Sequence, residues 1–184
     1  MGRAGFTLIE VIFVMAVIVI LAGMAVPQTM ASVDRSRAWA ATRYLASRMA
    51  LARMQAVGRS ATVGLRFADL EGAFGFDTFV DGNRNGVRTR EIASGVDRPL
   101  DPPTRLSDLF PGVVIGLSED EDGDPVRTGS TSLMSFTPVG TATSGTIYIR
   151  GRDGSRFAVR VLGATGRTRV LRFVARTSDW SENP

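Results

Sequence analysis

The sequence contains no cysteine, no histidine and no lysine. Without cysteine the chain has no disulfide framework and no thiolate nucleophile. Without histidine it lacks the most frequent general base, the most frequent metal ligand and the side chain that titrates near neutral pH. Carboxylates remain as acid–base groups, but no nucleophile stands beside a base. We therefore predict that the protein is not an enzyme and that it binds neither a cofactor nor a metal.

The 22 basic residues are all arginine, and they are unevenly distributed. One interpretation is codon usage in a GC-rich genome, and the other is a phosphate partner, since the planar guanidinium fork suits phosphate better than an ammonium does. Residues 146–176 carry eight arginines and a single acid, a net charge of +7, whereas residues 60–145 have a net charge of −6. A region this basic predicts a polyanion partner or an acidic neighbour in an assembly.

The N-terminal segment is a short leader followed by a long apolar run. Residues 6–26 are almost wholly apolar, and as a helix they would extend about 31 Å, which is enough to cross a bilayer core. The run is too long for a secretory signal peptide and lacks a small-residue cleavage site at its far end. Glu10 lies within it, and a carboxylate in a membrane helix is costly and usually functional. The pattern predicts a single transmembrane helix with a functional acid.

Residues 5–11, Gly-Phe-Thr-Leu-Ile-Glu-Val, resemble the prepilin-peptidase motif of type IV pilins and type II secretion pseudopilins. The resemblance implies that residues 1–5 are a prepilin leader, that the peptidase cuts between Gly5 and Phe6, and that the new amine is methylated. It also implies that Glu10 sets subunit register during assembly by neutralising such an amine. The implied location is the bacterial inner membrane, in a single pass, with a periplasmic globular domain that can be assembled into a filament. The implied partners are the prepilin peptidase, the membrane and other pilin subunits.

Residues 27–58 predict an amphipathic continuation of this helix. Pro27 is expected to loosen the turn that precedes it, and Gly58 to cap the C-terminal end. Apolar residues recur at spacings of three and four and form one stripe: Ala38, Ala41, Leu45, Met49, Ala52 and Ala56. Most arginines of the segment lie off this stripe, so we expect them to face solvent or a neighbouring subunit.

Residues 59–176 predict a β-rich globular domain, and no structure is predicted for the tail, residues 177–184. Runs of β-branched and aromatic residues are separated by turn residues. They predict strands at residues 61–68, 73–80, 87–93, 112–117, 132–137, 146–151, 155–163 and 168–176. The predicted fold class is α+β, with the long N-terminal helix packed on a mainly antiparallel β domain.

Three motifs of this domain resemble, in their order, the GspH/FimT family. They are residues 81–87, which precede Arg90 and Glu91, then residues 136–140, and then residues 166–170. This family includes the minor pseudopilin GspH of type II secretion and the minor pilin FimT of type IV pili. The resemblance implies a structural subunit of a pilus or pseudopilus.

Gly166, Arg167 and Arg169 match the Gly-Arg-x-Arg motif that binds DNA in FimT-like minor pilins of naturally transformable bacteria. The motif lies at a predicted turn, and other arginines are expected around it: Arg150, Arg152, Arg156, Arg160 and Arg172. We take Gly166, Arg167, Arg169, Arg150, Arg152 and Arg172 as candidate residues for binding double-stranded DNA through its phosphates. A stacking platform for single strands is not evident. The alternative is a GspH-like subunit of type II secretion that does not bind DNA.

Two further segments are rich in polar side chains. Asp81, Asn83 and Asn85 resemble the opening of an EF-hand loop, but Ile92 stands at the twelfth position, where that loop needs a glutamate. Because Asn85 precedes a glycine between strand-like runs, we predict a structural turn rather than a calcium site. Residues 119–124 are acidic, and a solvated loop is predicted there, with a divalent cation or a basic patch on a neighbouring subunit as alternatives.

Overall fold

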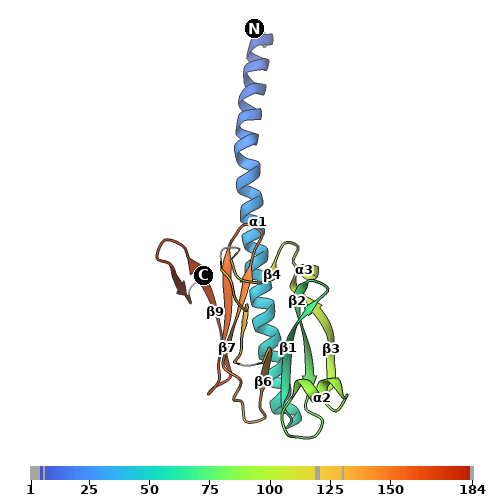
Figure 1. Ribbon diagram of the computed structural model, residues 1–184. Coiled ribbons are helices and arrows are strands. Elements are labelled where there is room, and N and C mark those ends of the chain that lie inside the picture. The colour runs from blue at the N-terminus through green and yellow to red at the C-terminus, as the bar shows by residue number, and fades with distance from the viewer. Residues whose placement is uncertain (1–4, 6, 119–120, 130, 183–184) are drawn as a thin grey trace.

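The computed structural model describes residues 5, 7–118, 121–129 and 131–182, and within them the chain forms one long helix and two antiparallel sheets. The long helix, α1 (Leu8–Arg59), projects from the globular domain with its N-terminal half and runs between the two sheets with its C-terminal half (Figure 1). Phe6 and most of the leader lie outside the described residues. The predicted class, a long helix on an antiparallel β domain, is confirmed.

The two predicted helical segments form a single helix that continues through Pro27. Thr7 caps the N-terminus, since its Oγ1 accepts a hydrogen bond from the Glu10 N–H at 3.4 Å. Gly58 is not the C-cap that we predicted. The helix extends one residue past it, and Ser60 adopts the left-handed conformation instead, donating its N–H to the Val57 carbonyl. The N-terminal part of α1 is exposed, and it is long and apolar enough to cross a membrane.

The apolar stripe of α1 forms the centre of the core. All six residues predicted for it are at most 1% exposed. They pack against buried side chains of both sheets, among them Leu65, Phe136 and Val159. Arg35, by contrast, is exposed, as predicted for residues off the stripe.

The first sheet has the strand order β3-β2-β1-β6. Its strands are β1 (Val63–Leu70), β2 (Ala73–Val80), β3 (Arg98–Arg105) and β6 (Leu133–Phe136). The second sheet has the order β10-β9-β8-β7-β4, and β5 also pairs with β7. Its strands are β4 (Val114–Ile115), β5 (Val126–Arg127), β7 (Gly145–Arg150), β8 (Arg156–Leu162), β9 (Arg167–Val174) and β10 (Asp179–Ser181).

The strand predicted over residues 87–93 is wrong. Thr89–Ala93 forms the short helix α2. The carboxylates of Asp81 and Asp97 accept hydrogen bonds from the backbone N–H groups of this loop, including Gly86 at 2.6 Å and Arg88 at 2.9 Å. Backbone donors bound in this way are not available to a sheet ladder. Asp81 therefore serves as the internal acceptor of a structural turn.

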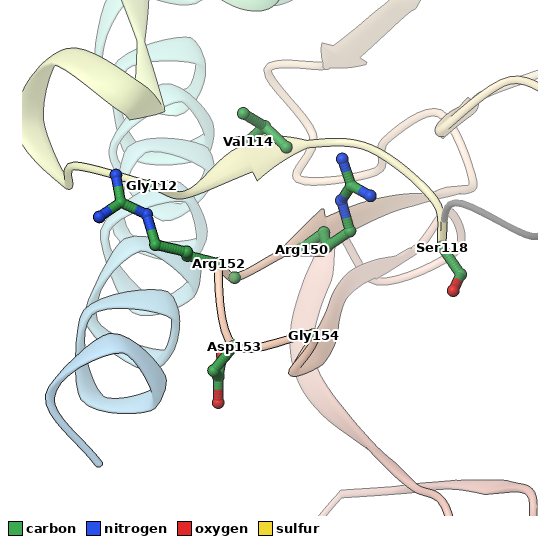
Figure 2. Close-up of a pocket in the computed structure, with 8 residues that line it drawn as sticks. Gly112, Val114, Ser118, Arg150, Arg152, Asp153 and Gly154 are labelled. Carbon is green, nitrogen blue, oxygen red and sulfur yellow. The ribbon is translucent and has the colours of Figure 1, made fainter. Parts of the chain in front are cut away.

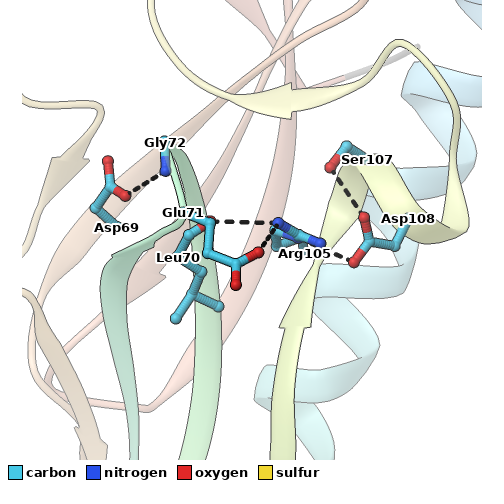
Figure 3. A network of polar contacts seen from close by, with 7 residues as sticks. All are labelled: Asp69, Leu70, Glu71, Gly72, Arg105, Ser107 and Asp108. Carbon is cyan, nitrogen blue, oxygen red and sulfur yellow. Dashed lines mark hydrogen bonds and ion pairs between the residues drawn. The ribbon is translucent and has the colours of Figure 1, made fainter.

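Strand β3 was not predicted because its sequence holds three prolines. Proline lacks the N–H that a central strand needs, but it is tolerated at the edge of a sheet, and β3 is one of the two edge strands of the first sheet. A polar network then joins β3 to the β1–β2 hairpin and to helix α3 (Leu106–Leu109) (Figure 3). Arg105 donates to Asp108 at 3.0 Å and to Glu71 at 3.2 Å. The hydrogen bond to Asp108 is the main cause that raises the pKa of Arg105 above its ordinary value.

Candidate functional site

The predicted Gly-Arg-x-Arg motif lies at the β8–β9 turn, against the last turns of α1. Gly166 is buried there with φ +59°. A Cβ atom at this position would lie 2.5 Å from the Gly140 carbonyl oxygen and 2.9 Å from Arg53 Nε. Arg53 in turn donates to the Gly140 carbonyl at 3.2 Å. Both the backbone conformation and the close approach therefore require glycine.

Arg167 and Arg169 follow Gly166 on β9 and are exposed. Residues two apart on a strand share a face, so both side chains lie on the face of the second sheet that points away from α1. Arg160 lies directly opposite Arg169 on β8. Arg167 also lines a groove of about 710 Å³ with Arg53 and other residues at the end of α1. We call these four arginines (53, 160, 167 and 169) the distal arginines, because they lie toward the end of the domain where α1 stops.

The Arg169 guanidinium is paired within the chain. Its Nη1 donates to Glu182 Oε1, just beyond β10. The pair is accessible, since the Arg169 side chain is 42% exposed and that of Glu182 57% exposed. Arg160 donates from Nε to Thr146 Oγ1 at 3.3 Å.

Arg150 and Arg152 lie at the opposite end of the second sheet from the distal arginines. Arg150 ends β7 and Arg152 lies in the turn that joins β7 to β8, and both line a cavity of about 560 Å³. Figure 2 shows both side chains reaching toward β4, Arg152 beside Gly112 and Arg150 on the side of Ser118, while Asp153 points away. The antiparallel hairpin places this turn and the β8–β9 turn at opposite ends of β8.

Arg172 lies on the other face of the second sheet. It lines a cavity of about 290 Å³ together with Arg35, Trp39 and Phe157, on the side of α1. Arg172 is an odd number of residues from both Arg167 and Arg169, so it faces the other side of the sheet. The register agrees, because Arg172 pairs with the core residue Phe157. The expectation that Arg150, Arg152, Arg156 and Arg172 surround the motif is therefore wrong. In the described structure Gly166, Arg167 and Arg169 stay together, Arg160 lies beside them as expected, and Arg53 joins them.

An aromatic cluster on the outer face of the second sheet was missed at the level of the sequence. The Trp180 ring lies 5.4 Å from the rings of both Tyr148 and Phe173. Arg156 lies 3.5 Å over the Phe173 ring, and Arg127 lies 5.0 Å over Tyr148. These rings thus have partners within the chain, and the cluster anchors the tail to the sheet. The alternating side-chain pattern of β7 and β9 places Tyr148 and Phe173 on the outer face of the sheet. Only the pairing of β10 with β9 brings Trp180 beside them.

The acidic segment contacts the same face. Glu121 accepts a hydrogen bond from Arg156 Nη1 at 2.7 Å, so at least one of its acids has a partner within the chain. Residues 119 and 120 lie outside the described residues.

The residues predicted for processing and assembly lie at the exposed start of the chain. Gly5 is exposed, and Glu10 is exposed on the first turn of α1. Phe6, the predicted site of methylation, lies outside the described residues. The globular domain therefore does not cover Glu10 in the described structure.

Similarities to known proteins cover both parts of the chain. The model of the family described as type II transport protein GspH matches residues 41–166, and the model of the prokaryotic N-terminal methylation motif matches residues 1–26. A pilin-like protein of Thermus thermophilus, PilA1, is 40% identical over 85 residues, which are 46% of this chain. That match spans 53% of the relative, about half its length. The minor pseudopilin EpsH of the Vibrio cholerae type 2 secretion system is similar over 74% of this chain and 97% of its own, with 15% identity and a TM-score of 0.49.

Proposed function

Since the chain belongs to the GspH family of type II transport proteins and is a structural subunit of the pilin or pseudopilin type, we propose that it is a FimT-like minor pilin that binds double-stranded DNA at its distal arginines. The family consists of structural subunits rather than enzymes. The single observation that carries the DNA proposal is the geometry of the β8–β9 turn. Gly166, closely packed against Arg53 and Gly140, displays Arg167 and Arg169 on one open face.

In this proposal α1 anchors the subunit in the bacterial inner membrane before assembly, with the globular domain in the periplasm. The prepilin peptidase removes residues 1–5, and Glu10 pairs with an N-terminal amine in the filament. The match to the N-terminal methylation motif and the exposed apolar half of α1 support this order of events. A carboxylate that is exposed to lipid is costly until it is paired, so Glu10 favours association with other pilin subunits.

The position of the distal arginines supports a role in binding. Arg53 and Arg167 line the groove at the C-terminal end of α1. Figure 1 shows that this end of the helix lies opposite its exposed half, so the groove is kept away from the membrane that holds that half. Arg167 and Arg169 are two residues apart on a strand, so their Cα atoms are separated by about 6.7 Å. Arg160, Arg167 and Arg169 are exposed on one face of the sheet. Their guanidinium groups contact phosphates without recognising base sequence.

The test measures how tightly the full-length wild-type chain and two double variants bind a short fluorescein-labelled DNA duplex. All three are kept in a non-ionic detergent at low salt. Arg167→Gln/Arg169→Gln should weaken binding at least tenfold, because two phosphate contacts are lost. Arg152→Gln/Arg176→Gln removes the same charge at the opposite end of the sheet and is the matched control. Equal losses in both variants would show that binding follows net charge and would refute a site at the distal arginines.

A GspH-like subunit of type II secretion without DNA binding is the second candidate. It is favoured by the intramolecular pair between Arg169 and Glu182, which satisfies one motif arginine without any nucleic acid. In that case the wild-type chain would bind the duplex no better than Arg167→Gln/Arg169→Gln, and the distal arginines would be an assembly surface.

A further inference from the structure

The C-terminal tail returns along β9 toward the Gly-Arg-x-Arg motif. Strand β10 pairs antiparallel with residues 172–174, and Trp180 is held between Tyr148 and Phe173. This anchor positions the next acid of the tail, Glu182, on Arg169. The tail therefore presents a carboxylate to a guanidinium that the proposed function assigns to DNA phosphate.

We infer that the tail is an internal anionic strand that competes with DNA for Arg169. This inference rests on the proposed function and adds a regulatory element to the same site. A carboxylate and a phosphate accept hydrogen bonds from the same guanidinium fork, so a docked Glu182 takes an Nη1 N–H that a bidentate phosphate would use and places a second negative charge beside that phosphate. Because Trp180 keeps the tail docked, the Glu182 carboxylate has a high effective concentration at Arg169.

The exposure of the pair makes the competition reversible. An exposed ion pair shifts an equilibrium by only about 1.4- to 5-fold, so DNA phosphates can displace Glu182 at low cost. The pair between Glu121 and Arg156 differs, since Arg156 is also stacked on Phe173 and its side chain is 24% exposed. Glu182 is thus the acid whose removal should affect the motif directly.

The experiment measures duplex affinity of the full-length chain across a salt series. Glu182→Gln should tighten binding about 1.4- to 5-fold, because the carboxylate no longer has to be displaced from Arg169 before a phosphate contacts it. Asp179→Asn is the matched control. It removes one negative charge from the same tail. The Asp179 carboxylate accepts a hydrogen bond from the backbone N–H of Trp180, and the side-chain oxygen of an asparagine can accept the same bond.

A double-mutant cycle separates competition from a general charge effect. In an Arg169→Gln background, Glu182→Gln should change the affinity no more than Asp179→Asn does. If Glu182→Gln and Asp179→Asn have equal effects in the wild-type background, or if the Glu182→Gln gain persists without Arg169, the inference is overturned while the proposed function stands. If no variant and no wild-type chain binds the duplex at any salt concentration, both are overturned.

Discussion

Gly166 packs against the Arg53 side chain so closely that a Cβ atom on Gly166 would lie 2.9 Å from Arg53 Nε and 3.1 Å from Arg53 Cδ. We predict that Gly166→Ala lowers the free energy of unfolding by about 1–3 kcal/mol, because it adds this overlap to the strain of a positive φ. Gly154→Ala is the control, since Gly154 has φ +77° but nothing within 4 Å of an added Cβ. Urea unfolding followed by tryptophan fluorescence measures both. Equal losses would show that the contact with Arg53 adds nothing.

The buried stripe of α1 makes a second prediction. Met49→Ala should lower the free energy of unfolding by about 2–5 kcal/mol, because Met49 is fully buried between the sheets and its loss leaves a cavity. Met54, five residues further along α1, is 66% exposed, so Met54→Ala should change stability by no more than about 0.5 kcal/mol. Comparable losses for the two variants in urea unfolding would contradict the described packing of α1.

The aromatic cluster makes a third prediction. Trp180→Ala should lower the free energy of unfolding by about 1–3 kcal/mol, since it removes two ring contacts and the anchor of β10. Trp180→Phe keeps an aromatic ring at this position and should lose less. Trp39 remains as the fluorescent probe in both variants. A Trp180→Ala chain as stable as the wild type would mean that the tail does not dock on the sheet.

Glu10 gives a prediction about assembly. Glu10→Leu should still fractionate with membranes, because the substitution lengthens the apolar run, but it should be absent from filaments sheared from cells, because the partner of the N-terminal amine is lost. Thr7→Ala is a control on the same turn that keeps the charge. Recovery of Glu10→Leu in filaments at the wild-type level would exclude the proposed role of Glu10 in assembly.

Much of the fold was predictable because its periodicity is strong. The three- and four-residue spacing of α1 identified all six apolar residues that the described helix buries. In β8, Phe157, Val159 and Val161 alternate with Arg156 and Arg160, and these three apolar residues are buried in the core. The prolines of β3 concealed an edge strand. The segment around Glu91 has β-like residues, but the neighbouring carboxylates bind its backbone and it forms α2.

The candidate site was predictable only in part. The motif itself was identified, together with its turn, but the other arginines were grouped by sequence proximity and net charge. The hairpin connectivity of residues 145–174 already places Arg150 and Arg167 at opposite ends of the sheet, and this signal was available in the sequence. The contact between Glu182 and Arg169 was not, because the tail has no strand pattern and its position depends on the ring of Trp180.

The salt dependence of duplex binding by the full-length wild-type chain tests the central claim most directly. Contacts from Arg160, Arg167 and Arg169 predict that log affinity falls with log salt concentration with a slope of about −2.7, and that Arg167→Gln/Arg169→Gln flattens this slope to about −0.9. A slope that is the same in the wild type and in Arg167→Gln/Arg169→Gln, or an absence of binding at low salt, would contradict DNA capture at the distal arginines.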